Sequence, residues 1–266
     1  MPELPEVELY RRQFEEVALD QVIKAVETEN EGRMVPSGLE NLRKTTVGKA
    51  MVETERIGKY LFVRLSDGGP WLMWHFGLTG SFTYYQDEEM QHRFARIFFH
   101  FENGWILSFN SMRKFSRLEI TDSLEAYQKK KKLGQDAGRI SLEDFTQALQ
   151  SKTMQIKPAL LEQKKFAGVG NWMADEMLLW TRLHPETRCN EIDTEAYHHL
   201  HAALQEIIQT AIDYGAYYES FPEKYLVRVR EDGGHCPRCD RELTRLVVGG
   251  RGTYICENCQ GSSPEG

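Results

Sequence analysis

Apolar and aromatic residues gather in short stretches between about residues 22 and 120, and Gly, Asp or Asn separate these stretches. Clear examples are KYLFVRL (59–65), PWLMWHF (70–76), ARIFFHF (95–101) and WILSFN (105–110). Runs of this length and composition, bounded by turn-forming residues, are typical of β-strands. Their spacing predicts a β-sandwich or barrel of about 100 residues, preceded by a helix over residues 6–17.

The period changes to that of helices at Ser141. SLEDFTQALQ begins with Ser141 and Asp144 three positions apart, which is the spacing of a capping box. The stretch 194–214 (TEAYHHLHAALQEIIQTAIDY) has the length and pattern of a long amphipathic helix. Residues 128–139 (QKKKKLGQDAGR) are polar, charged and contain glycine, so they are predicted to connect two domains.

The fold class expected from these patterns is α+β. It comprises an N-terminal β-sandwich with an N-terminal helix, a helical domain and a cysteine-containing hairpin. The predicted limits are 1–127 for the sandwich, 128–140 for the linker, 141–222 for the helical domain, 223–262 for the hairpin and 263–266 for a disordered tail.

Composition narrows the class of protein. The 266 residues are 41% hydrophobic and 27% charged, which is ordinary for a globular protein. We find no run of about 18 apolar residues and no basic segment followed by an apolar stretch at the N-terminus, so a cytoplasmic location is the default expectation. The formal net charge of −7 argues mildly against a nucleic-acid partner, although a basic cleft can coexist with an acidic surface.

Four of the five cysteines lie near the C-terminus. Cys236 and Cys239 form one Cys-x2-Cys pair, and Cys256 and Cys259 form another after sixteen intervening residues. This spacing predicts one structural zinc ion held by four thiolates, with a hairpin turning at Gly249 and Gly250. A redox pair is the alternative, but no βαβ pattern surrounds the cysteines. Arg251, beside the turn, is either a phosphate or base ligand or a solvated side chain.

The stretch AGVGNWMADE (167–176) places two glycines and Asn171 before a predicted helix. Backbone N–H groups at a helix start can hold a phosphate, and Asn171 is a good helix cap as well as a phosphate hydrogen-bonder. Helices precede the motif and no Gly-Lys-Ser/Thr follows, so it is neither a dinucleotide fingerprint nor a P-loop. A simple helix cap remains the alternative.

The first residues, MPELPEVELY, carry two prolines and three glutamates within eight positions. Pro5 suits the first turn of a helix, and Glu6 and Glu8 suit its positive end. Pro2 and Glu3 have no such explanation. Together, MPELPEVE, GVGN and the four-cysteine hairpin with Arg251 resemble the formamidopyrimidine-DNA glycosylase and endonuclease VIII family, and are closer to the formamidopyrimidine-DNA glycosylase branch.

The resemblance implies a bifunctional DNA glycosylase and abasic-site lyase that acts on damaged duplex DNA as a monomer. Removal of Met1 would leave Pro2 as the N-terminal amine, which attacks sugar C1′ and forms an iminium that permits β,δ-elimination. Glu3 would transfer a proton at the sugar ring oxygen. Glu6 would be a further active-site acid, or simply a charge at the helix N-terminus. Lys59 in RIGKYLF would bind lesion phosphates, where the alternative is a surface lysine at a strand start.

The resemblance also implies a helix-two-turn-helix DNA-binding domain and three side chains that enter the duplex when a nucleotide is flipped out. HFGLTG puts Leu78 at one of these positions, and NSMRKFS puts Arg113 and Phe115 at the others; core packing is the alternative for Leu78 and Phe115. Four further residues match positions of the family: Lys157 a cleft lysine, Asn171 the residue that grips the DNA backbone, Glu176 an acid that orients the N-terminus, and Arg251 the hairpin arginine that binds the lesion phosphates.

Two departures bear on these expectations. Ser111 and Met112 stand where the family commonly has Asp-Pro, which affects the placement of Arg113. The stretch between the long helix and Cys236 is short and leaves little room for the loop that guanine-specific members close over 8-oxoguanine. Formamidopyrimidines, oxidised pyrimidines and other modified bases are therefore candidate substrates besides 8-oxoguanine. Two alternatives to the enzyme remain: a non-catalytic binder of DNA structure, and a zinc-ribbon interaction protein without a DNA role.

Overall fold

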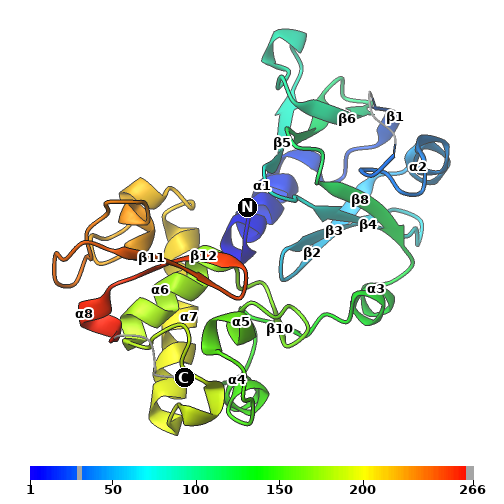
Figure 1. Cartoon of the computed structure of the whole chain (residues 1–266). Helices are drawn as coiled ribbons and strands as arrows, with labels where there is room; N and C mark the ends of the chain where they lie inside the picture. The colour runs from blue at the N-terminus through cyan, green and yellow to red at the C-terminus, as the bar shows by residue number, and fades with distance from the viewer. Residues whose placement is uncertain (29–31, 262–266) are drawn as a thin grey trace. The chain divides into compact units, whose positions relative to one another are not determined.

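The structure is a computed structural model that describes residues 1–28 and 32–261 (Figure 1). The tail predicted at 263–266 lies outside the described residues. The chain divides into two compact units. One unit contains Met1–Pro2 and Glu6–Lys132, and the other contains Glu3–Pro5 and the chain from Leu133 onward.

The first unit is a β-sandwich of two antiparallel sheets. One sheet has the strand order β1-β6-β7-β5 and the other β2-β3-β4-β8. The helices and strands of this unit are α1 (Leu4–Ala18), β1 (Ile23–Thr28), α2 (Leu39–Thr46), β2 (Met51–Ile57), β3 (Tyr60–Leu65), β4 (Trp71–His75), β5 (Gly80–Tyr85), the 3-10 turn η1 (Glu88–Met90), β6 (Ala95–Phe101), β7 (Ile106–Ser111), β8 (Arg117–Thr121) and α3 (Leu124–Lys131). The predicted sandwich and N-terminal helix are confirmed.

Aromatic side chains from both sheets meet in the core of the sandwich. The Trp74 ring on β4 lies 5.4 Å from the Phe99 ring on β6 and 4.8 Å from the Phe109 ring on β7. Phe14 of α1 packs against Trp74 at 5.7 Å. All four side chains are fully buried, so helix α1 is part of this core. Burial of these rings supplies a large share of the driving force for folding.

Helix α3 was not expected, because its residues overlap the predicted linker. Ser123 caps it by accepting a hydrogen bond from the Ala126 N–H at 3.1 Å. Tyr127 anchors it, since this ring is 1% exposed and lies 5.4 Å from the Phe62 ring. Lys131 pairs with Glu119 at 3.2 Å. One buried aromatic residue thus makes part of the lysine-rich stretch helical.

The second unit contains the helices, the cysteine hairpin and a short parallel strand pair. Its elements are β9 (Gln135–Asp136), α4 (Leu142–Leu149), α5 (Ile156–Leu160), β10 (Phe166–Ala167), α6 (Asn171–Thr181), η2 (Cys189–Glu191), α7 (Thr194–Asp213), η3 (Tyr218–Ser220), η4 (Leu226–Val229), β11 (Thr244–Val248), β12 (Arg251–Ile255) and α8 (Glu257–Gln260). The finer limits 141–222 and 223–262 stay a prediction.

Local signals account for several of these elements. The Ser141 Oγ accepts from the Asp144 N–H at 3.1 Å, which confirms the cap predicted for α4. Gly249 and Gly250 have φ values of 56° and 73° between β11 and β12. Two successive positive φ values define the tight turn of a hairpin and favour glycine. The core of this unit includes Leu4, so the start of the chain contributes to it.

Candidate functional site

The first turn of α6 holds the carboxylate of Glu3. Its Oε1 accepts a hydrogen bond from the Trp172 N–H at 3.1 Å, and its Oε2 accepts from the Met173 N–H at 3.4 Å. Glu3 is 2% exposed. The N-terminus of a helix carries partial positive charge and unpaired N–H donors, so it stabilises an anion there. The predicted helix start therefore binds an anion of the chain itself.

The glycines of the GVGN motif make this approach possible. A Cβ at Gly170 would lie 2.0 Å from the carboxyl carbon of Glu3, and a Cβ at Gly168 would lie 2.5 Å from Leu4 Cδ1. The Leu4 N–H also donates to the Gly168 carbonyl at 3.2 Å. These contacts explain both glycines, because any larger residue would collide with the first residues of the chain.

Asn171 does not cap α6, so that interpretation is wrong. Gly170 is the capping residue and no side chain caps the helix. Asn171 Nδ2 instead donates to the carbonyl of Gly252 on β12 at 2.8 Å. The side chain thereby links the start of α6 to the hairpin that carries Arg251, which is exposed.

Lys157 is buried, whereas the family resemblance predicts a lysine that lines the DNA-binding cleft. Its side chain is 0% exposed and its Nζ lies 2.6 Å from Asp175 Oδ1. Nζ also donates to Thr253 Oγ1 at 2.5 Å. Burial lowers the pKa of Lys157, and the Asp175 carboxylate opposes this effect. In this structure Lys157 therefore serves the interior of the unit and offers no ammonium to a phosphate.

Glu176 is also fully buried, and three N–H donors surround its carboxylate. Leu226 N–H and Val227 N–H donate at 2.9 Å each, and Trp180 Nε1 donates at 2.7 Å. Burial raises the pKa of Glu176 to about 7, against these three hydrogen bonds, which favour the charged form. The contacts tie α6 to η4 and place Glu176 as a structural acceptor rather than as a surface ligand.

In the first unit, Lys59 occupies the turn between β2 and β3 and is 9% exposed. The next residue, Tyr60, is opposite His75 on β4, and their rings lie 5.0 Å apart. Burial lowers the pKa of His75 to about 4, and Lys59 and Arg117 add to this effect. The imidazole is therefore neutral at pH 7 and does not repel Lys59. Sequence reasoning missed His75, although it lies within HFGLTG.

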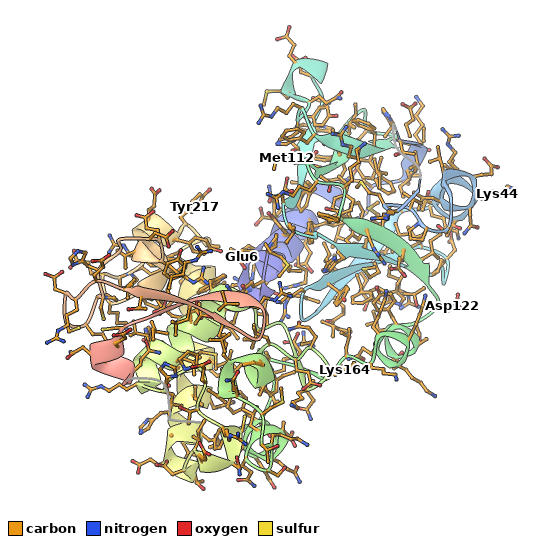
Figure 2. All side chains as sticks on the ribbon, viewed as in Figure 1. Glu6, Lys44, Met112, Asp122, Lys164 and Tyr217 are labelled. Atoms are coloured by element: carbon orange, nitrogen blue, oxygen red, sulfur yellow. The ribbon has the colours of Figure 1, made fainter. Side chains whose placement is uncertain are left out.

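The two loops predicted to enter the duplex, residues 75–80 and 110–116, touch each other. A Cβ at Gly77 would lie 2.7 Å from the backbone of Phe115, and Ser116 Oγ donates to the Phe76 carbonyl at 2.9 Å. Leu78 is 36% exposed and Phe115 is 52% exposed, so the alternative that they are core residues is wrong. Arg113 is exposed beside them, and Met112 in the same loop is also exposed (Figure 2).

Two acidic residues near the start of helix α1 differ in their surroundings. Glu6, in the first turn, is half-buried. Burial of Tyr10 raises the pKa of its hydroxyl to about 12, and the Glu6 carboxylate adds to this effect. Glu8 pairs with Arg56 at 3.0 Å and with Arg11 at 2.9 Å. Burial alone would raise the pKa of Glu8, but these arginines lower it to about 2. Glu8 is therefore a structural carboxylate of the first unit.

The four predicted cysteine ligands come together. The Sγ atoms of Cys236, Cys239, Cys256 and Cys259 all lie within 4.8 Å of one another. Four thiolates from two tight turns are the donor set of a closed tetrahedral zinc site without an open catalytic position. The cluster holds one structural zinc ion, which confirms the predicted cofactor. Cys189 is buried elsewhere in the same unit.

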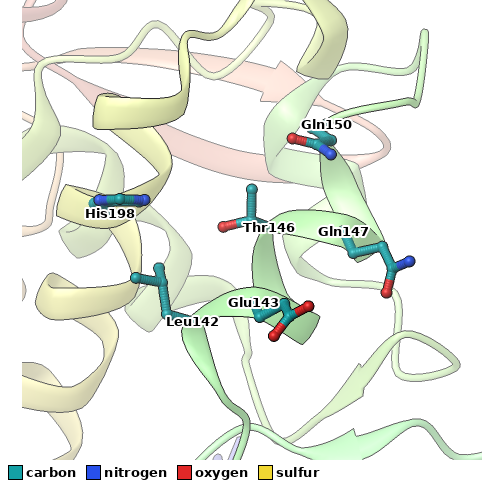
Figure 3. A pocket seen from close by; sticks show the side chains of 6 residues that line it. All are labelled: Leu142, Glu143, Thr146, Gln147, Gln150 and His198. Carbon is teal, nitrogen blue, oxygen red and sulfur yellow. The ribbon is translucent and has the colours of Figure 1, made fainter.

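A separate pocket of about 490 Å³ lies on helices α4 and α7 (Figure 3). The residues that line it are Leu142, Glu143, Thr146, Gln147, Gln150 and His198. None of the predicted site residues is among them, so the pocket does not belong to the site described above. Within the described residues, no helix has the length and apolar character that crossing a bilayer requires.

Comparison with protein families agrees with this geometry. Residues 1–118 match the formamidopyrimidine-DNA glycosylase N-terminal domain, residues 133–222 match the formamidopyrimidine-DNA glycosylase H2TH domain, and residues 233–261 match the zinc finger found in FPG and IleRS. The chain is 34% identical to the formamidopyrimidine-DNA glycosylase of Streptococcus pyogenes, over 99% of this chain and 100% of that protein. It is 31% identical to that of Streptococcus thermophilus, over 98% of this chain and 99% of that protein.

Solved structures give the same result. The Lactococcus lactis formamidopyrimidine-DNA glycosylase bound non-covalently to DNA with an abasic site superposes with a TM-score of 0.88, at 32% identity, over 98% of this chain and 100% of that one. The Lactococcus lactis enzyme in complex with DNA that contains FAPY-dG has the same TM-score, identity and coverage.

Proposed function

Because the chain belongs to the formamidopyrimidine-DNA glycosylase family, it is a DNA glycosylase with abasic-site lyase activity, and we propose that Pro2 and Glu3 carry out its chemistry. The substrate is an oxidised or otherwise damaged base in duplex DNA, and the chain acts on it as a monomer. We place the activity in the cytoplasm, on the nucleoid.

Pro2 is the proposed nucleophile, and it requires the removal of Met1. While Met1 is present, the nitrogen of Pro2 is an amide and cannot attack. Once it is free, the α-amino group has a pKa of about 7.7–8, so a useful fraction is neutral at physiological pH. Attack on sugar C1′ displaces the damaged base, and opening of the sugar ring by cleavage of C1′–O4′, with a proton delivered to O4′, then leaves an iminium. The iminium is an electron sink that permits β- and then δ-elimination of the flanking phosphates.

Glu3 is the proposed proton-handling group, and its placement is the observation that carries the proposal. The carboxylate is buried, and two N–H donors of α6 hold it. It is also covalently adjacent to Pro2. A fixed carboxylate beside the amine suits proton transfer at the sugar ring oxygen. A protein that only binds DNA structure would not need this arrangement.

Six further site residues are proposed to hold the DNA. Lys59, Asn171 and Arg251 have side chains suited to phosphate oxygens. Leu78, Arg113 and Phe115 are exposed on adjoining loops, as expected of side chains that fill the gap left by a flipped nucleotide. Glu6 is proposed as a further active-site acid. Lys157 and Glu176 are buried, and they are proposed to support the DNA-binding surface by holding together the interior of the second unit.

The test is a borohydride trap. Purified protein is incubated with a duplex that contains one abasic site, borohydride is added, and the covalent adduct is mapped by mass spectrometry. We expect an adduct on residue 2 of protein that lacks Met1, and none on a matched preparation that retains Met1. Tight binding without an adduct, from protein confirmed to lack Met1, would instead identify a non-catalytic DNA binder.

A survey of lesions follows from a positive trap. Duplexes with a formamidopyrimidine, an oxidised pyrimidine or 8-oxoguanine are compared under single-turnover conditions. The short stretch between α7 and Cys236 leads us to expect that excision of formamidopyrimidines exceeds that of 8-oxoguanine. Equal or faster excision of 8-oxoguanine would contradict this expectation.

A further inference from the structure

The second unit contains a buried ionic cluster that none of the catalytic steps above uses. Asp175 on α6 is 1% exposed. Its Oδ1 lies 2.6 Å from Lys157 Nζ, and its Oδ2 lies 2.6 Å from Arg230 Nη2 and 2.8 Å from Arg230 Nε. The Tyr254 N–H on β12 donates to the same Oδ2 at 3.3 Å. One carboxylate thus joins two cations and a strand of the zinc hairpin.

The two cations do more than neutralise Asp175, because both also approach one backbone carbonyl. Lys157 Nζ lies 3.4 Å from the carbonyl oxygen of Gly252, and Arg230 Nη2 lies 3.2 Å from it. Asn171 Nδ2 is a third donor to this oxygen, at 2.8 Å. Three side chains from different parts of the unit therefore converge on a single peptide group.

Burying a carboxylate and an ammonium is costly, and a buried ion pair is often no more stabilising than apolar residues of the same size. A cluster of this kind is better explained by the geometry it imposes than by the stability it adds. The geometry here concerns Gly252, the residue that follows Arg251. Fixing the Gly252 carbonyl restricts the backbone from which the exposed Arg251 side chain projects.

The side chains of Arg230 and Lys157 are suited to holding the backbone of β12. Arg230 presents its planar fork to Asp175 and to the Gly252 carbonyl at once, which a lysine cannot reproduce. Its guanidinium also lies 5.1 Å from the centre of the Tyr254 ring. Thr253 Oγ1 accepts from Lys157, which holds the next residue of β12 as well. The strand is thus restrained at three successive residues after Arg251.

We propose that Asp175 is a positioning residue for DNA-phosphate binding: it orients Lys157 and Arg230 around the Gly252 carbonyl and thereby sets the direction in which Arg251 meets a phosphate. Asn171 shares this carbonyl, so the same cluster aligns both phosphate ligands of the second unit. The inference rests on the proposed function, in which Arg251 and Asn171 contact DNA.

The test compares Asp175→Asn with Arg251→Ala and with the double variant. Affinity for a duplex with one tetrahydrofuran abasic-site analogue is measured over a range of salt concentrations. Each phosphate contact contributes about 0.9 to the slope of log affinity against log salt. We expect Asp175→Asn and Arg251→Ala each to reduce this slope by about one contact and to weaken binding roughly tenfold. In the double variant the salt slope should fall no further than in Arg251→Ala alone, because the neutral Asn171 does not contribute to it.

Glu206→Gln is the matched control. It also changes a carboxylate to an amide in an ion pair of the same unit, with Lys224 at 2.6 Å, but this pair is about half exposed. Zinc content and thermal unfolding are measured for every variant. A purely structural role of Asp175 would lower the unfolding temperature and leave the salt slope unchanged. If Asp175→Asn does not fold, Arg230→Lys takes its place and should reduce the slope in the same direction.

The outcomes separate this inference from the proposed function. A wild-type salt slope in Asp175→Asn, together with a reduced slope in Arg251→Ala, overturns the positioning role and leaves phosphate binding by Arg251 intact. A wild-type slope in Arg251→Ala overturns both. The borohydride adduct on residue 2 is independent of either result and tests the catalytic proposal alone.

Discussion

The backbone N–H of Trp172 donates a hydrogen bond to Oε1 of Glu3 at 3.1 Å, although 168 residues lie between them. The third residue of the chain is thus held by the first turn of a helix in the second unit. This relationship gives the GVGN motif its physical meaning. Its glycines admit the start of the chain, and its helix supplies the N–H donors.

Gly170→Ala tests this relationship directly. The added Cβ would lie 2.0–2.4 Å from the carboxyl atoms of Glu3 and would displace them. Loss of a positioned proton-transfer group typically costs about 100-fold or more in rate. We therefore expect a loss of this size in single-turnover base excision.

Gly134→Ala is the control for general crowding in the same unit. Its Cβ would lie 2.0 Å from the Lys165 carbonyl oxygen, so it is equally crowded but does not touch Glu3. Comparable losses of excision in both variants, at equal zinc content, would contradict a specific role of Gly170.

Phe115→Ala should separate activity from stability. The ring is 52% exposed, so its removal should change the free energy of unfolding by no more than about 0.5 kcal/mol. Excision from a duplex should nevertheless fall by about tenfold or more, because the wedge that compensates unstacking is lost. Urea unfolding and single-turnover excision measure the two effects.

Phe109→Ala is the comparison, because it should lower the free energy of unfolding strongly. This ring is 0% exposed, and removing a buried phenylalanine costs about 3–5 kcal/mol. If Phe115→Ala destabilised the protein to the same extent, Phe115 would belong to the core after all.

Loss of the zinc ion should disable DNA binding. Four thiolates bind the ion, and metal binding of this kind contributes directly to folding of a small hairpin. We expect one zinc per chain, released by a thiol-modifying reagent and detected with a metal-sensitive dye. Cys259→Ser should lose the zinc and weaken binding to an abasic-site duplex. Cys189→Ser, at a buried cysteine outside the cluster, should retain both properties.

Glu8 should contribute an acid-sensitive part of the stability. Its folded pKa of about 2 is below the ordinary value of 4.5, so its contribution is fully present above pH 4.5 and is lost as the pH falls towards 2. The contribution is at most about 3 kcal/mol. Glu8→Gln should therefore be less stable than wild type at pH 6, and the difference should vanish near pH 2.

Urea unfolding of both proteins over this pH range measures the effect. Glu53→Gln is the control, since Glu53 pairs with Arg64 at 3.2 Å on the surface and exposed pairs contribute less than about 1 kcal/mol. A difference between wild type and Glu8→Gln that does not change with pH would contradict the assignment.

Much of the site was predictable because its signals are local. The cysteine spacing predicted the zinc ligands, since two Cys-x2-Cys turns suffice to build a tetrahedron. ARIFFHF predicted β6 at Ala95–Phe101, because aromatic and branched residues between turn formers favour a strand. The residues of MPELPEVE could be assigned to catalysis only through resemblance to a family.

Other features depended on residues far apart in the sequence. Lys157 looked like a cleft lysine, but Asp175 and Thr253 enclose it. Asn171 looked like a helix cap, but the Gly252 carbonyl takes its amide. His75 was not singled out, because only the pairing of β3 with β4 brings it beside the residue that follows Lys59.

The sequence by itself determined several strands of the sandwich, the long helix, the zinc ligands and the family, because each follows from short-range pattern and spacing. The tertiary structure decided which carboxylate meets the start of α6, which cations are buried and which aromatic residues stay exposed. Hydrophobic periodicity states which face of an element is buried, but it does not state against which partner. The partner of each face is decided only when all elements pack together. This packing brings Lys157 and Arg230 to Asp175, which no local pattern in the sequence indicated.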